Sequence, residues 1–179
     1  MVSQPTSHEL MLAAAANCKK ALELGTKKWG LVSTHHKALF PADCDFTMTD
    51  YLDGEDVDVV SDAHDFKECK NNSFEGVFSA STFEHIQFPW IAAQALHRIV
   101  APGGWLYVAT HQTFPVHGYP YDYTRWTDEG LRSLFEWAGF TVEAATMDQP
   151  CKIVPPSDIG PWDHNAPSFI GVSVFCRKN

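Results

Sequence analysis

The stretch LHRIVAPGGWLYVATH, residues 96–111, decides the fold class of this chain. Its first residues complete a helical pattern over Pro89–Val100, in which apolar side chains recur on one face. The Pro-Gly-Gly sequence at 102–104 stops that helix, and Trp105–Thr110 then forms the clearest strand pattern in the sequence. A helix followed at once by a buried strand is the repeating unit of an α/β fold.

The same alternation continues on both sides of this stretch. A helix is expected at Leu10–Ala16, and another begins after the N-cap Thr127 and ends at Gly139. Short apolar runs predict six further strands, at Lys20–Leu24, Asp45–Thr49, Val57–Val60, Glu75–Ala80, Thr141–Ala145 and Ser168–Cys176. Strands that alternate with helices predict a mostly parallel sheet covered on both faces.

Two connections depart from this alternation. The crossover from Gly25 to Phe46 contains His35-His36 and Pro41, so its helix is expected to be short or missing. The last two strands are joined by an irregular, proline-rich segment, which favours an antiparallel pair. We therefore predict one Rossmann-like domain over residues 1–179, with residues 1–19 as an N-terminal helix or extension and 20–178 as the core.

The amino-acid composition limits the kinds of partner that this chain is expected to bind. The chain of 179 residues has 13 Lys and Arg against 22 Asp and Glu, a formal net charge of −9. Phosphate backbones and anionic lipids would repel such a chain, so we expect no nucleic-acid partner and no membrane surface. The five cysteines are odd in number and never spaced as C-x-x-C, which suits a reducing cytoplasm.

Polar residues stand where the predicted parallel strands end. Ligands of open α/β sheets bind at the carboxyl ends of the strands, so these residues are candidates to line one site. They are Glu23, Gly25, Asp50, Asp62, His64, Glu84, His85 and His111.

Taken together, these segments resemble the class I S-adenosylmethionine-dependent methyltransferases, specifically the type 11-like domain. The resemblance covers roughly residues 20–178 and is strongest over 74–140. There, FEGVFSASTFEHI resembles the fourth strand of the family and its exit, and LHRIVAPGGWLYVATH resembles the helix-PGG-strand signature. It implies a seven-stranded, mostly parallel sheet whose last strand pair is antiparallel, with helices on both faces.

The resemblance also implies a cofactor, S-adenosylmethionine, and residues that hold it. Asp50 would accept both ribose hydroxyls, and Asp62 would accept from the adenine amino group beside Ala63 and His64. Glu23 would lie under the methionine amino group, and Ser81 near the cofactor at the exit of the fourth strand. The remaining positions are those of the loop after the first strand, Gly25, Thr26 and Lys27.

Each of these residues also has a purely structural interpretation. The acidic residues at strand ends could cap helices or satisfy turns. The loop itself departs from the family pattern G-x-G-x-G, because Lys27-Lys28 stand where the backbone usually approaches the cofactor. The glycine-rich loop is therefore degenerate, and a lysine there could instead pair with the carboxylate of the cofactor.

Methyl transfer needs a general base only where the acceptor is a hydroxyl or a protonated amine. Histidine suits that role because its pKa lies near neutrality. We therefore predict catalytic or acceptor-binding roles for His111 and His117, although either ring could simply order its loop. An acceptor pocket could be lined by Tyr121, Asp122, Tyr123 and Arg125, but Asp122 and Arg125 are expected instead to pin that loop as an ion pair.

The leading hypothesis is a methyltransferase that acts on oxygen or nitrogen of a small molecule. A second hypothesis is a non-catalytic or repurposed relative that binds a partner or another ligand. A third is a metal-assisted enzyme that uses the histidines after the strands, but no H-x-x-x-H or H-E-x-x-H spacing accompanies them, and no metal is expected. A homodimer is compatible with the sequence.

Overall fold

The computed structural model describes residues 4–118, 120–154 and 166–179. One seven-stranded sheet runs through these residues in the order β3-β2-β1-β4-β5-β7-β6. The first five strands pair in parallel, and β7 is antiparallel to both β5 and β6. The predicted Rossmann-like α/β fold with an antiparallel last pair is confirmed.

The elements follow the predicted order along the chain. The helices are α1 (Ser7–Ala15), α2 (Pro89–Ile99) and α3 (Asp128–Trp137), with short 3-10 turns η1 (Lys37–Leu39) and η2 (Phe83–His85). The strands are β1 (Lys20–Leu24), β2 (Asp45–Asp50), β3 (Val59–Val60), β4 (Phe74–Ala80), β5 (Val100–His111), β6 (Thr141–Cys151) and β7 (Ser168–Arg177).

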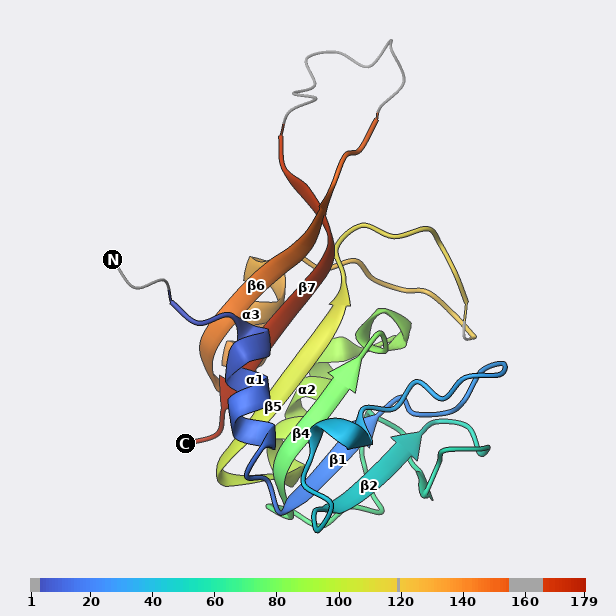
Figure 1. Cartoon of the computed structure of the whole chain (residues 1–179), viewed down its shortest axis with the longest axis vertical. Coiled ribbons are helices and arrows are strands. Elements are labelled where there is room, and N and C mark those ends of the chain that lie inside the picture. The colour runs from blue at the N-terminus through green and yellow to red at the C-terminus, as the bar shows by residue number, and fades with distance from the viewer. Residues whose placement is uncertain (1–3, 119, 155–165) are drawn as a thin grey trace.

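The helices cover opposite faces of the sheet (Figure 1). On one face, α1 brings Met11 and Ala15 into a buried cluster with Phe175 of β7. On the other, Leu96 of α2 and Leu131 of α3 belong to the larger buried cluster. As expected, Thr127 caps α3 through the Gly130 amide. The first helix begins at Ser7, earlier than the predicted Leu10, because Thr6 forms a capping box with Glu9.

The connection from β1 to β2 has only the three-residue turn η1, as the proline and paired histidines predicted. This leaves residues 25–36 as an extended loop at the carboxyl end of β1 (Figure 1). The strand bounds differ from the prediction mainly in three places: β3 is shorter, Val59–Val60 instead of Val57–Val60, and β5 and β6 are much longer. β5 already begins at Val100, so Pro102 and Gly103 lie in an irregularity of the strand rather than before it, and β6 continues through Pro150.

The proline-rich connection expected between the last strands falls partly outside the described residues, because 155–165 are not described. On either side of it, β6 and β7 form a long ribbon that rises beyond the rest of the sheet (Figure 1). Within the described residues, no helix is long and apolar enough to cross a membrane.

Gly76 of β4 has no side chain, and this leaves room for a large buried ring on the neighbouring strand. Gly76 pairs with Trp105 of β5, and a Cβ at position 76 would overlap the indole. That ring is 4% exposed and lies stacked near Phe40 and Phe175. The ring therefore has little room to move away.

We expect Gly76→Ala to lower the free energy of unfolding by about 1–3 kcal/mol, because it overpacks this layer. Urea denaturation followed by circular dichroism measures the loss. In a Trp105→Leu background the same substitution should cost clearly less, since its steric partner is gone. Equal costs in the two backgrounds would show that the indole is not the obstacle.

Candidate functional site

A cavity of about 880 Å³ lies at the carboxyl ends of β1, β2 and β4. Nine of the eleven site residues predicted from sequence line it: Glu23, Gly25, Lys27, Asp50, Asp62, Ala63, His64, Ser81 and His117. The other two, Thr26 and His111, are not among its lining residues. The parallel order of the strands has thus gathered side chains from positions 23 to 117 around one space.

Hydrogen bonds and close packing hold the loop that follows β1, residues 25–36. Glu23 is buried at the end of β1, and its carboxylate accepts hydrogen bonds from the His36 amide and contacts the His36 ring, each at 2.8 Å. Gly25 has φ +86°, and a Cβ there would overlap the side chain of Thr82. Thr26 is fully buried and donates to the Asp56 carbonyl at 2.6 Å, so its hydroxyl has a structural role.

Lys27 occupies the position where the family pattern has glycine. Its backbone amide donates to Asp50 Oδ2 at 3.1 Å, and its ammonium lies 4.7 Å from the centre of the Trp29 ring. The methylenes of Lys27 contact Gly54. The side chain therefore follows the cavity wall, where its charge is available to an anionic group.

Two aspartates from different strands face this cavity. Asp50 ends β2, and its second oxygen accepts from the Leu52 amide at 3.0 Å. Each carboxylate oxygen can accept two hydrogen bonds, so Asp50 keeps acceptor capacity for a ligand. Asp62 accepts from the amide and the Nδ1 of His64, at 2.9 and 2.6 Å. Burial alone would raise the pKa of Asp62, but these hydrogen bonds hold it below the usual value.

The other end of the cavity is formed by η2 and the loop 112–126. Glu84 of η2 is fully buried, and its Oε1 lies 3.1 Å from His111 Nε2 and 3.8 Å from the Nε2 atoms of His85 and His117. His85 and His117 line the cavity, and Glu84 lies behind them. His111 is instead stacked on Phe114, with ring centres 4.3 Å apart.

An ion pair pins the loop that carries His117, as the sequence predicted. The guanidinium of Arg125 binds both oxygens of Asp122, at 2.5 and 2.6 Å. Asp122 Oδ2 also accepts from the His117 amide at 2.9 Å. Arg125 thereby lowers the pKa of Asp122 far below its ordinary value of 3.8.

Two further lining residues were candidates from sequence. His85, like Glu84 behind it, was visible as a polar residue at a strand exit, and Tyr121 was a candidate for an acceptor pocket; His85 and Tyr121 both line the cavity. The remaining lining residues were not assigned to the site, because most of them come from irregular loops that carry no periodic signal: Trp29, Thr34, His36, Tyr51, Ser61, Thr82, Ile86, Gln87, Phe88 and Pro120, together with the strand residues Leu24 and Ala80.

The sequence model of the methyltransferase domain family matches residues 30–108, from the first loop into β5. The strand order and the cavity at the carboxyl ends agree with that match. The chain thus has the class I methyltransferase fold, and part of its sequence matches the family model. No curated protein sequence matches it significantly.

Solved structures share the fold of this chain at low identity. A complex between the Haloferax volcanii Trm112 methyltransferase activator and a methyltransferase matches with 21% identity and TM-score 0.64, over 96% of this chain and 87% of that one. The 1,6-didemethyltoxoflavin-N1-methyltransferase of Burkholderia thailandensis, bound to 1,6-didemethyltoxoflavin and S-adenosylhomocysteine, matches with 14% identity and TM-score 0.65, over 97% and 76%. A SAM-dependent methyltransferase from Archaeoglobus fulgidus matches with 14% identity and TM-score 0.60, over 96% and 95%.

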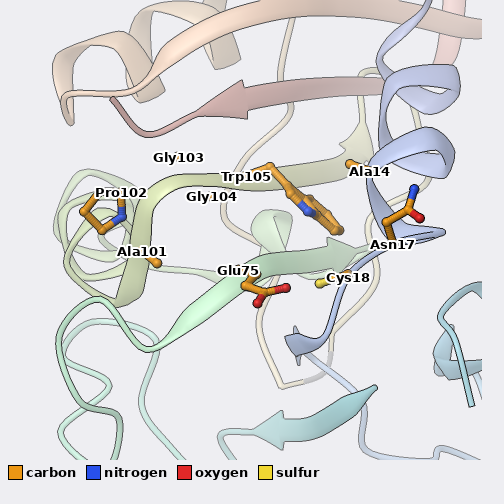
Figure 2. A pocket seen from close by; sticks show the side chains of 9 residues that line it. All are labelled: Ala14, Asn17, Cys18, Glu75, Ala101, Pro102, Gly103, Gly104 and Trp105. Atoms are coloured by element: carbon orange, nitrogen blue, oxygen red, sulfur yellow. The ribbon is translucent and has the colours of Figure 1, made fainter. Parts of the chain in front are cut away.

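A second hollow of about 310 Å³ lies near the start of β4, away from the strand exits (Figure 2). Small residues such as Ala14 and Gly104 form much of its wall. Its carboxylate, Glu75, accepts from the Lys19 amide at 2.7 Å. This hollow therefore brings together neither the predicted residues nor a cluster of reactive groups.

We expect Asp122→Asn to lower the free energy of unfolding by about 1–2 kcal/mol at neutral pH, because it removes a charged partner from a part-buried ion pair. The folded-state pKa of Asp122 is depressed, so its contribution is present above the ordinary carboxyl value of 3.8 and fades as the pH falls below it. Urea titrations of both proteins between neutral pH and the acid range measure the difference.

The matched control is Asp43→Asn, which breaks the Asp43–Lys19 ion pair. Both of those side chains are more than 60% exposed to solvent, which screens the pair, so the loss should be much smaller than that of Asp122→Asn. Similar losses in the two variants would contradict the anchoring role of Asp122.

Proposed function

We propose that this protein transfers a methyl group from S-adenosylmethionine to an oxygen or nitrogen atom of a small molecule. The observation that carries the proposal is the placement of Asp50 and Asp62, from the ends of neighbouring strands, on the wall of one cavity. A carboxylate at each place matches what a ribose diol and an adenine amino group require, since both offer donors.

The cofactor fits the groups on this wall. Glu23 and Lys27 supply opposite charges near Gly25, where the amino and carboxylate ends of a methionine moiety would each find a partner. Asp50 retains acceptor capacity beyond the two amides that orient it. Ala63, Ile86 and Phe88 offer an apolar surface for a flat ring beside Asp62. When bound, the cofactor supplies a methyl group on a sulfonium.

The acceptor would enter from the end formed by His85, His117 and Tyr121. A volume of about 880 Å³ is within the usual range for small-molecule pockets. In this arrangement His117 touches the acceptor, and His111 acts from behind by contacting Glu84. Alignment of the two reactants then supplies most of the rate enhancement.

A second candidate is a repurposed domain that binds a partner or another ligand. The loop 25–36 favours it, because Glu23 already holds His36 and Lys27 stands where close backbone approach is usual in the family. One structural relative is a complex with a methyltransferase activator, and another is described as a [4+2]-cyclase, SpnF, at 17% identity and TM-score 0.56. A partner protein or another reaction on this fold is therefore the alternative.

We also place the protein in the cytoplasm, because all five cysteines are free thiols. Burial raises the pKa of Cys18 to about 12 and raises that of Cys176 as well, so these two thiols are poor nucleophiles.

We expect S-adenosylhomocysteine to bind and to stabilise the fold by about 2.7 kcal/mol at a concentration of 100 times its Kd. Asp50→Asn should weaken this binding by at least about tenfold, since a hydrogen bond to a charged group contributes roughly 1.5–3 kcal/mol. Isothermal titration calorimetry and thermal unfolding measure both effects.

Asp53→Asn is the matched control, because Asp53 is an exposed acid three residues further on and does not line the cavity. It makes the same change of charge and should leave binding unaltered. Absence of any heat or stabilisation in the native protein at millimolar ligand would refute the methyltransferase proposal and favour the second candidate.

A further inference from the structure

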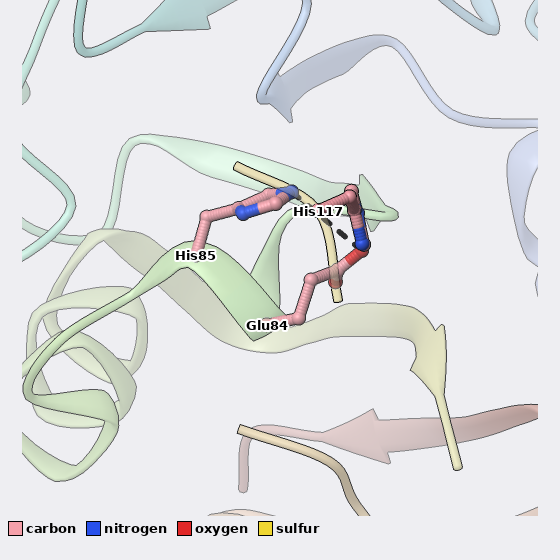
Figure 3. A group of neighbouring side chains, drawn as sticks. All are labelled: Glu84, His85 and His117. Atoms are coloured by element: carbon pink, nitrogen blue, oxygen red, sulfur yellow. Dashed lines mark ion pairs between the residues drawn. The ribbon is translucent and has the colours of Figure 1, made fainter. Parts of the chain in front are cut away.

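Glu84, His85 and His117 converge at the acceptor end of the cavity (Figure 3). Glu84 and His85 come from η2, whereas His117 comes from the loop 112–126. One ligand atom from each lies within 4.8 Å of the others. One carboxylate oxygen and two imidazole nitrogens are a donor set that zinc and related transition ions prefer.

Hydrogen bonds fix the orientation of both rings. His85 Nδ1 lies 2.5 Å from the Tyr121 carbonyl, and His117 Nδ1 lies 3.1 Å from the Pro115 carbonyl. A carbonyl oxygen can only accept, so each Nδ1 carries the proton. In the neutral ring Nε2 then presents a lone pair, and in both residues Nε2 is the atom that faces Glu84 Oε1. A carbonyl that holds the outer nitrogen is a common support of metal-binding histidines.

A hydrogen bond also orients the Glu84 carboxylate. Glu84 Oε2 accepts from the Thr110 hydroxyl at 2.6 Å, which leaves Oε1 facing the rings. Oε1 is buried, and within the described part of the chain it makes no hydrogen bond of acceptable geometry, although His111 Nε2 is 3.1 Å away. A buried carboxylate oxygen without a hydrogen bond is costly, and a cation bound beside it would offset that cost.

The spacing fits an ion of this class. At the tetrahedral angles of such sites, bonds of about 2.0–2.2 Å place two ligand atoms about 3.4 Å apart. Each Nε2 lies 3.8 Å from Oε1, so these two pairs would close by roughly half an ångström, and the ligand atoms of the two rings, which lie within 4.8 Å of each other, would approach by at most about 1.4 Å. Small side-chain torsion changes that keep each Nδ1 near its carbonyl supply such shifts.

We propose that Glu84, His85 and His117 bind one divalent transition ion of the zinc class. Three protein ligands leave at least one coordination position open, as in catalytic zinc sites. His85 and His117 line the cavity, so that position faces the acceptor space. This part rests on the proposed function: the ion selects acceptors that offer an oxygen, and His117 serves as a ligand rather than as a base. The sequence, with no helical histidine pair, led us to expect no metal.

The test is a titration of chelator-treated protein with Co²⁺ alone, followed by its d–d absorption bands, and then displacement by Zn²⁺. We expect one equivalent to bind to the native protein and Mg²⁺ to fail to compete. The double variant His85→Ala/His117→Ala should lose at least about 10- to 100-fold in affinity, the range seen even for outer partners of metal ligands. Circular dichroism verifies that this variant is folded.

His8→Ala is the matched control, because His8 lies exposed on α1, outside the cluster. It should bind Co²⁺ as the native protein does. If the native protein binds no Co²⁺, or if the double variant binds it equally well, the proposal is overturned. A parallel titration with S-adenosylhomocysteine on metal-free protein separates the two proposals, because cofactor binding at Asp50 does not require the ion.

Discussion

A buried carboxylate joins the two halves of the cavity. Glu84 follows β4, accepts from Thr110 of β5 through Oε2, and contacts His111 where β5 ends. Its backbone carbonyl also accepts from the Tyr123 amide at 2.7 Å, so the loop 112–126 is built onto the same residue. Burial works to raise the pKa of Glu84, but its contacts with His111 and Thr110 outweigh that effect and keep the carboxylate charged. The end of the cavity formed by η2 and the loop 112–126 is therefore built around this carboxylate.

The two ends of the cavity differ in how they are made. At the end near β1 and β2, the acids stand at or just after the ends of parallel strands, and backbone amides such as that of Lys27 orient them. At the other end, side chains reach in from η2 and from a loop that the Asp122–Arg125 pair holds. The first end is set by the sheet, whereas the second is set by buried charges that must be satisfied together.

This difference explains which residues of the cavity could be predicted from the sequence and which could not. Strand exits are visible in sequence, so Asp50 and Asp62 could be placed on one cavity from the parallel order alone. Thr26 and His111 occupy comparable places, but their side chains turn to the Asp56 carbonyl and to Glu84, a choice that depends on contacts distant in sequence. His85 and His117 were among the histidines that loops after strands could bring together. Which of these histidines meet could not be predicted, because an irregular loop brings residues 32 positions apart together.

The contact between Gly25 and Thr82 has an evolutionary consequence. Thr82 fills the space beside Gly25 and donates to the Leu24 carbonyl at 3.3 Å, so the loops after β1 and β4 share one steric boundary. A side chain at position 25 would demand both a smaller residue at position 82 and a different backbone conformation. Among chains descended from a common ancestor, these two positions should therefore change in concert, although 57 positions separate them.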